Sequence, residues 1–209
     1  MTPRCDALIL AGGRAERLGV ASKADVTVDG VSLLTRVLGA VTCAERVVVV
    51  GRTADVLPPG VILTCEDPPF GGPVAGIEAG LEALERAGGP HDAPDCVLLL
   101  AVDIPGAAGA VEPLLAEYGA ASSSGTIPDG VCLFRDDHPQ WLCAAYRKES
   151  LTAALGRVRA DRGTTRNQSV RRLMDGVTLV HLDDGDTRAS DDVDTWQDHA
   201  RIEALIARQ

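Results

Sequence analysis

Several segments of the chain are strand-like, rich in valine, isoleucine and leucine, and continuously rather than alternately apolar over most of their length. They cover residues 7–11, 46–51, 61–65 and 96–102, and segments with helical spacing lie between them. A strand that is apolar on both faces is buried on both sides, which is typical of parallel sheets covered by helices. The sequence therefore predicts an α/β fold with three layers (α/β/α), in which a mainly parallel sheet lies between two layers of helices.

The length of the chain suits one domain, and we expect a single domain over residues 1–209. Hydrophobic residues make up 45% of the sequence, but no apolar run is long enough to cross a bilayer. The first residues lead directly into the first apolar run and lack the features of a signal peptide. These observations predict a cytoplasmic protein that makes no contact with a membrane.

The net charge of −10 limits the classes of partner that the chain can attract. Acidic residues are dense between Asp183 and Asp198, so we expect no binding to nucleic acid or to anionic lipid. A polyphosphate ligand would have to arrive with a metal ion and meet local basic residues. The six cysteines lack the spacing of zinc ligands, and we expect most of them to be free thiols in the core.

The first apolar run stops at a pair of glycines and continues into a loop with basic residues. Gly12 and Gly13 allow the backbone to approach a ligand closely and to direct N–H groups toward it. Guanidinium and ammonium groups supply the charge that a polyphosphate needs. This pattern predicts a phosphate site, although a tight turn with surface basic residues has the same local pattern. The further glycine and basic residues of the loop are Arg14, Arg17, Gly19 and Lys23.

The spacing of this loop excludes two common phosphate-binding motifs. A Walker A loop has four residues between its glycines, and Lys-Ser or Lys-Thr follows the second glycine directly. Here Gly13 and Gly19 enclose five residues and Val20 follows. The Gly-x-Gly-x-x-Gly fingerprint of dinucleotide-binding folds is also absent from the loop.

A single aspartate follows the apolar run at residues 96–102. The run delivers Asp103 to the end of a predicted buried strand, where an unpaired charge is costly. Ligand sites of open α/β sheets lie beyond the carboxyl ends of such strands. Magnesium is bound through one or two carboxylates plus phosphate oxygens and would compensate this charge. Asp103 is therefore a candidate metal ligand, and a cap of the following helix is the alternative.

Taken together, these motifs resemble those of the nucleotidyltransferases with a GT-A-like fold. Residues 10–19 match the signature Leu-Ala-Gly-Gly-x-x-x-Arg-x-Gly, and Lys23 follows it. Within that superfamily the chain is most similar to the molybdenum cofactor guanylyltransferases. The later motifs follow in the order of that family, with Gly-Pro-x-Ala-Gly-Ile at 72–77, Asp-x-Pro at 103–105 and Asp-x-Asp-Thr at 192–195.

The resemblance implies a transferase that moves GMP from GTP to the terminal phosphate of molybdopterin bearing molybdenum, with release of pyrophosphate. It also implies Mg²⁺ as the cofactor and GTP and molybdopterin as ligands. Transient contact with a molybdoenzyme or with cofactor-insertion proteins, and assembly into a homo-oligomer, are compatible with this activity.

The same resemblance implies roles for individual residues. Arg17 would contact the leaving β- and γ-phosphates, Lys23 would neutralise charge near the α-phosphate, and Asp103 would act in catalysis as a magnesium ligand. Asp194 would be a second metal ligand, although a helix cap explains it equally well. Asp67 matches an acidic residue associated with guanine recognition or metal support. The implied nucleotide-binding residues are Leu10, Ala11, Gly12, Gly13, Gly19, Lys23, Arg52, Asp67 and Asp103.

Ser22 and Val102 are among the residues that depart from the pattern of that family. Ser22 stands where an aspartate is usual before the lysine, and Val102 stands where the residue before Asp103 is usually polar or small. The first change removes an orienting partner of Lys23. Two other functions therefore stay open. One is a related transferase that uses another nucleotide or acceptor, such as CTP with molybdopterin, a sugar phosphate or phospholactate. The other is a catalytically weak nucleotide-binding protein with a regulatory role.

Overall fold

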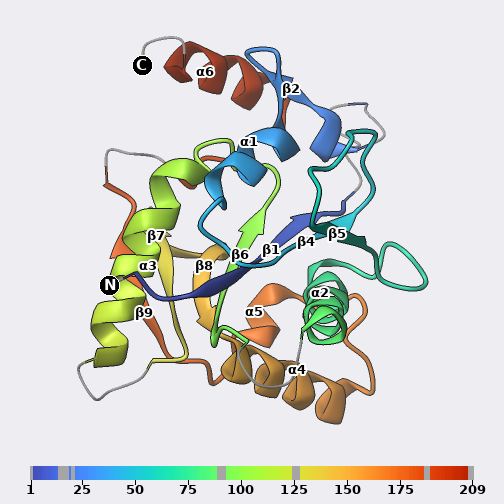
Figure 1. The fold of residues 1–209 in the computed structure, drawn as a ribbon, viewed down its shortest axis with the longest axis vertical. Coiled ribbons are helices and arrows are strands. Elements are labelled where there is room, and N and C mark those ends of the chain that lie inside the picture. The colour runs from blue at the N-terminus through green and yellow to red at the C-terminus, as the bar shows by residue number, and fades with distance from the viewer. Residues whose placement is uncertain are drawn as a thin grey trace.

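The computed structural model of the chain describes residues 2–13, 19, 22–88, 93–123, 128–185 and 189–206. Within these residues a seven-stranded sheet, ordered β5-β4-β1-β6-β8-β7-β9, forms the middle layer (Figure 1). The elements in chain order are β1 (Cys5–Ala11), η1 (Lys23–Asp25), β2 (Thr27–Val28), β3 (Val31–Ser32), α1 (Leu33–Ala40), β4 (Val47–Gly51), β5 (Val61–Thr64), α2 (Pro73–Ala87), β6 (Cys96–Ala101), α3 (Ala107–Ser123), β7 (Gly130–Arg135), β8 (His138–Arg147), α4 (Lys148–Arg162), α5 (Val170–Leu173), β9 (Leu179–Asp183) and α6 (Trp196–Ile206).

The sheet is mainly parallel, which confirms the predicted fold class. β1 pairs in parallel with β4 and with β6, and β4 pairs in parallel with β5. Among the described strands of this sheet, β8 alone runs the other way, because it is antiparallel to both β6 and β7 while β7 and β9 are parallel. Leu100 of β6 lies opposite Cys143 of β8. The start of β8 therefore lies beside the carboxyl end of β6, where the candidate site was predicted.

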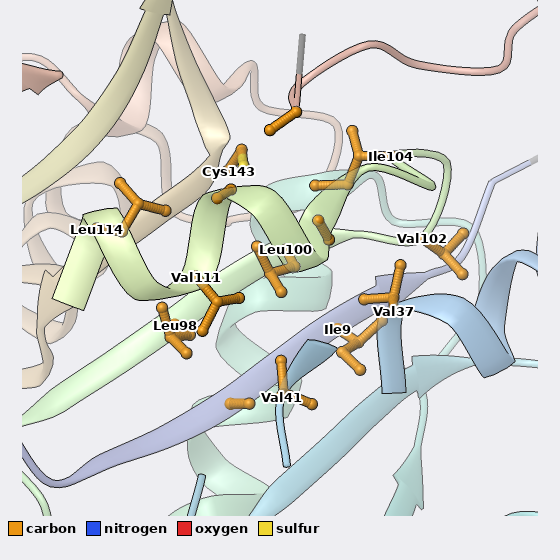
Figure 2. Packing of buried hydrophobic residues seen from close by; sticks show 14 of the residues in the cluster. Ile9, Val37, Val41, Leu98, Leu100, Val102, Ile104, Val111, Leu114 and Cys143 are labelled. Carbon is orange, nitrogen blue, oxygen red and sulfur yellow. The ribbon is translucent and has the colours of Figure 1, made fainter. Parts of the chain in front are cut away.

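Successive residues of β1 point into two separate cores. Ile9 belongs to the core under α1 and α3, whereas Leu8 and Leu10 belong to the core under α2, α4 and α5. Figure 1 shows these two groups of helices on opposite sides of the sheet. Figure 2 shows the first core, with Val111 of α3 over Leu98 of β6. Burial on both faces explains why the central strands are apolar without alternation.

The helices begin where the sequence supplies the expected signals. Ser32 caps α1, since its Oγ accepts a hydrogen bond of 3.1 Å from the backbone N–H of Thr35. Pro73 is an early residue of α2, where a missing N–H has no cost. Thr195 and Asp198 cap α6 reciprocally, because each side chain accepts a hydrogen bond from the backbone N–H of the other.

A short hairpin and α6 form a separate layer above α1 (Figure 1). Asp29 and Gly30 join β2 to β3 with φ of 51° and 73°, the positive values that a type I′ turn needs. The backbone N–H of Asp29 donates to Glu203 of α6 over 3.3 Å, and Nε2 of His199 lies 2.6 Å from the carbonyl oxygen of Thr27. These contacts hold α6 against the hairpin.

The six cysteines are free thiols, as predicted, and four of them are buried. Burial raises the pKa of Cys132 to about 12, so this thiol is neutral at physiological pH. Within the described part of the chain, no helix combines the length and the apolar character needed to cross a membrane.

Candidate active site

Two cavities of about 300 Å³ and 320 Å³ open at the carboxyl ends of the parallel strands. This edge is where open α/β sheets bind their ligands. The two cavities share Gly12, Gly13, Glu66 and Phe70. The first, which we call the β6 cavity, is also lined by Leu10, Val50, Gly72, Pro73, Gly76, Ala101, Val102, Asp103 and Leu142. The second, the β4 cavity, is also lined by Ala11, Ser22, Asp25, Gly51, Arg52, Thr53, Ala54, Cys65 and Pro69.

The glycine pair after β1 lies in the wall between these cavities. Gly13 has a φ of 135°, which a residue with a side chain rarely adopts. At the end of β4, a Cβ on Gly51 would lie 2.6 Å from the backbone N of Gly12. Gly51 therefore allows β4 to lie directly against the glycine loop. Gly19 also has a positive φ of 67°, whereas the predicted phosphate contact Arg17, with Arg14, lies outside the described residues.

Lys23 joins the two predicted metal ligands. Its Nζ lies 2.8 Å from Oδ2 of Asp103 and donates a second, shorter hydrogen bond to Oδ1 of Asp194. Only 15% of the Lys23 side chain is exposed. Residues that are 80 and 171 positions apart in the sequence thus meet at one point. The hydroxyl of Thr195 caps α6, since it accepts a hydrogen bond from the backbone N–H of Asp198.

The carboxylates of Asp103, Asp192 and Asp194 surround Lys23 among the described residues. Burial alone would lower the pKa of Lys23, but the charges and hydrogen bonds of Asp103 and Asp194 outweigh it and raise the pKa, so the amine is a cation at neutral pH. Desolvation, followed by the nearby charges of Asp103 and Asp194, raises the pKa of Asp192. Among the described residues at this point, three carboxylates accompany one ammonium.

Ser22 and Val102 both have a structural role. The Ser22 hydroxyl donates to the carbonyl oxygen of Arg52 over 3.0 Å and accepts from the N–H of Ala24, so it connects the end of β4 to η1. Lys23 is oriented by Asp103 and Asp194 without an acidic neighbour in sequence. Val102 is buried, and its N–H donates to the carbonyl oxygen of Leu10 over 3.0 Å.

The predicted nucleotide contacts beyond the glycine loop separate in the structure. Arg52 is exposed and lines the β4 cavity. Asp67 lines neither of the two cavities; it lies in a polar pocket between β5, α2 and residues 163–166. Its neighbour Glu66 lines both cavities as well as that polar pocket. Sequence reasoning missed Glu66, and its one available signal was its position two residues after the last residue of β5.

The carboxylates can be tested against the needs of a magnesium ion. Among the residues that the structure describes, no three His, Cys, Asp or Glu side chains form a group able to hold a metal by themselves. Magnesium is commonly bound through one or two carboxylates, with phosphates and water completing the octahedron. Asp103 and Asp194 lie close enough to share one ammonium, so they fit this set of ligands.

The fold and the position of these residues define an α/β nucleotidyltransferase. A molybdopterin-guanine dinucleotide biosynthesis protein A from Archaeoglobus fulgidus has a similar structure, with a TM-score of 0.67 and 20% identity, over 98% of this chain and 100% of that chain. Residues 7–179 match the model of the MobA-like NTP transferase domain, and the chain belongs to this family.

Two further solved structures share the fold. A 2-C-methyl-D-erythritol 4-phosphate cytidylyltransferase from Thermus thermophilus has a TM-score of 0.63 and 20% identity, over 97% of this chain and 98% of that chain. A nucleotidyl transferase from Methanothermobacter has a TM-score of 0.66 and 19% identity, over 98% of each chain. No curated protein matches the sequence significantly. At identities of 19–20%, these structural matches show the fold and do not identify the substrates.

Proposed function

We propose that the chain transfers GMP from GTP to the phosphate of molybdopterin bearing molybdenum and releases pyrophosphate. The observation that carries this proposal is the meeting of Lys23 with Asp103 and Asp194 beside the glycine pair. A cation and two carboxylates at this point match the needs of a nucleotide that is bound with a divalent ion. The family supports nucleotidyl transfer, and the choice of GTP and molybdopterin is our inference.

The reaction needs positioning and charge compensation more than proton transfer. An oxygen of the acceptor phosphate attacks the α-phosphorus of GTP, a new P–O bond forms, and the bond to the β-phosphate bridging oxygen breaks. The nucleophile is already ionised, so it requires no general base. His138 fits this expectation, because it is the exposed first residue of β8 and its Nδ1 is 2.6 Å from the carbonyl oxygen of Asp136.

Asp103 and Asp194 would hold magnesium, which when bound neutralises charge on the phosphates. The backbone N–H groups of Gly12 and Gly13 would bind phosphate oxygens. The hydrogen bonds of Lys23 to Asp103 and Asp194 would weaken when the nucleotide binds. The ammonium of Lys23 would then point toward the negative charge that develops at the α-phosphate.

Glu66 favours guanine over the other bases. A carboxylate only accepts hydrogen bonds, and guanine presents adjacent N1–H and N2–H donors on one edge. One oxygen of Glu66 accepts a hydrogen bond of 3.1 Å from the N–H of Gly71, which holds the side chain at the cavities, and its other lone pairs would accept the hydrogen bonds of the base.

The test is pyrophosphate release by the purified protein with magnesium, molybdopterin and each of the four nucleoside triphosphates. The proposal expects release with GTP and little with ATP, CTP or UTP. Release with CTP in place of GTP would contradict the guanine assignment. Replacement of molybdopterin by a sugar phosphate or by phospholactate, with release retained, would contradict the acceptor. Binding of GTP without any release would indicate a regulatory protein.

The first prediction concerns the Lys23→Ala variant. We expect kcat for pyrophosphate release to fall about 100- to 1,000-fold, because one preorganised charge at the reacting phosphate is lost. The control is Arg172→Ala, which removes a cation from an exposed pair with Asp161 and should leave turnover unchanged. Circular dichroism of both variants checks the fold. Normal turnover by a folded Lys23→Ala protein would show that Lys23 does not act in the reaction.

A further inference from the structure

Phe70 combines two features that are unfavourable in a folded chain. Its φ is 64°, in the left-handed region that bulky residues rarely adopt, and 53% of its surface is exposed. It lines both the β6 cavity and the β4 cavity, together with the glycine pair. Strained backbone at a ligand cavity is commonly retained because the side chain is needed there.

Hydrogen bonds hold the backbone of the loop just before and just after Phe70. The guanidinium of Arg166 donates to the carbonyl oxygens of Pro68 and Pro69, over 2.5 Å and 3.3 Å. The N–H of Asn167 donates to the carbonyl oxygen of Gly71 over 2.6 Å. The phenyl ring is therefore presented to the cavities by a fixed backbone, which reduces the entropy lost when a ligand binds to it.

We propose that Phe70 is the platform on which the nucleobase of the substrate stacks. This inference rests on the proposed function, because it assumes a nucleoside triphosphate with its phosphates at Gly12 and Gly13. Both cavities extend from these glycines to Phe70, so the ring lies within reach of the base in either cavity. Phe70 would contact the face of the base and Glu66 its edge.

Under this proposal, Phe70 contributes mainly to the affinity for nucleotides, and Glu66 contributes to the selectivity among bases. Every base has a π-face, so stacking on a phenyl ring adds affinity without distinguishing strongly between bases. Hydrogen bonds to the edge of a base do distinguish them. Loss of Phe70 should therefore weaken all nucleotides by a similar factor and leave the preference among them unchanged.

The experiment measures binding by isothermal titration calorimetry in the presence of magnesium, without an acceptor. The probes are GTP, ATP, CTP, UTP and inorganic tripolyphosphate, which has no base. The variants are Phe70→Gly, in which glycine suits the observed φ, and Phe70→Tyr, which keeps an aromatic ring. The control is Leu63→Ala on the edge strand β5, where a side chain with 50% of its surface exposed is shortened away from both cavities.

We expect Phe70→Gly to bind GTP about 5- to 100-fold more weakly than the unmodified chain. Its affinity for tripolyphosphate should stay the same, and its melting temperature should be unchanged or higher because the strain is relieved. Phe70→Tyr should bind GTP within about twofold of the unmodified chain, since stacking is preserved.

Three outcomes would overturn the inference in distinguishable ways. If the unmodified chain binds GTP and Phe70→Gly binds it equally well, Phe70 is not the platform and the proposed function stands. If Phe70→Gly instead weakens tripolyphosphate as much as GTP and melts at a lower temperature, Phe70 only supports the loop. If the unmodified chain binds none of the four nucleotides, the proposed function and this inference are both wrong.

Discussion

At the scale of residues, two adjacent acidic side chains after β5 lie in different surroundings. Glu66 lines the cavities beside the glycine pair, whereas Asp67 lines only the polar pocket next to α2. Both residues lie beyond Thr64, the last residue of β5, so the alternation of a strand does not determine where their side chains point. The sequence alone therefore favours Asp67 and Glu66 equally on chemical grounds, and only the fold distinguishes them.

This difference leads to a paired prediction. Glu66→Gln replaces an acceptor oxygen by an N–H donor that faces the N–H groups of guanine, so kcat/KM for GTP should fall. A hydrogen bond to a charged group contributes about 1.5–3 kcal/mol, which corresponds to about 10- to 150-fold. Asp67→Asn is the matched control and should leave kcat/KM for GTP unchanged. If a steady-state assay instead shows that Asp67→Asn lowers kcat/KM for GTP and Glu66→Gln does not, Asp67 and not Glu66 recognises guanine.

At the scale of elements, a buried ionic network holds the segment that brings Asp194 to Lys23. Arg135, at the end of β7, pairs with Asp191, and Nη1 of Arg201 in α6 lies 3.0 Å from the same carboxylate. Oδ1 of Asp184 accepts a hydrogen bond of 2.9 Å from the N–H of Ala189, and Oδ2 accepts from Ser190. The N–H of Val193 donates to the carbonyl oxygen of Asp103 over 2.9 Å, which brings this segment to the end of β6.

We expect the Arg135→Met variant to lower both stability and activity. Methionine keeps the length of the aliphatic chain, but Asp191, which is 7% exposed, loses a cationic partner. Arg201 still pairs with Asp191 in this variant. We therefore expect the free energy of unfolding in urea to fall by about 1–3 kcal/mol, less than the roughly 3–5 kcal/mol typical of a buried charge that loses its partner altogether. kcat should fall as well, because Asp194 is held less firmly.

The control for this prediction is Arg172→Met. Arg172 pairs with Asp161 at the surface, where their side chains are 38% and 63% exposed. Surface pairs contribute about 0–1 kcal/mol, so this variant should unfold like the unmodified chain. Equal stability of the two variants would show that the network around Asp191 does not hold the segment.

The elements that the sequence predicts best are those with one dominant physical cause. Continuous apolar runs locate β1, β4, β5 and β6 to within about two residues. For β1, β4 and β6 the cause is burial on both faces. β5 is an edge strand with partly exposed side chains, but it is equally rich in β-branched and aliphatic residues. The start of β8 is less predictable, since His138, Pro139 and Gln140 join the sheet without apolar side chains. Its antiparallel direction depends on which strand it pairs with, and this is a property of the whole fold.

The candidate site is predictable in part for the same reason. Gly12 and Asp103 follow buried strands, so their place at the carboxyl edge follows from the sheet. The contact between Lys23 and Asp194 does not follow from the sequence, because a carboxylate before a helix is equally suited to cap it. Thr195 takes the cap in the structure and leaves Asp194 to meet the lysine.

At the scale of the whole molecule, the candidate site and a cluster of stabilising ion pairs lie at opposite edges of the sheet. The cavities lie at the carboxyl ends of the strands, while a second ionic cluster lies at the amino end of β1. Asp6 is fully buried there, and its carboxylate accepts hydrogen bonds from Arg46 over 2.5 Å and 2.8 Å and from Lys148 over 2.7 Å. Asp6 is in β1, Arg46 directly precedes β4, and Lys148 is the first residue of α4, so the cluster connects three distant parts of the chain.

The last prediction concerns the Asp6→Asn variant. Asparagine has almost the same shape, but it leaves the partly buried cations of Arg46 and Lys148 without their anion. We expect the free energy of unfolding in urea to fall by about 3 kcal/mol. Glu45→Gln, at the same end of the molecule but in an exposed pair with Arg4, should change it by less than about 1 kcal/mol.

The same Asp6→Asn protein also tests the separation of the two edges. GTP affinity, measured by calorimetry well below the unfolding temperature, should stay within about twofold of the unmodified chain, because sites far apart without shared partners contribute independently. A large loss of affinity in the folded variant would mean that the strands transmit changes from the amino end to the glycine loop. An unchanged free energy of unfolding would instead mean that water solvates Arg46 and Lys148 in the variant in place of the Asp6 carboxylate. The side chains of these two residues are 20% and 18% exposed, which would permit this solvation.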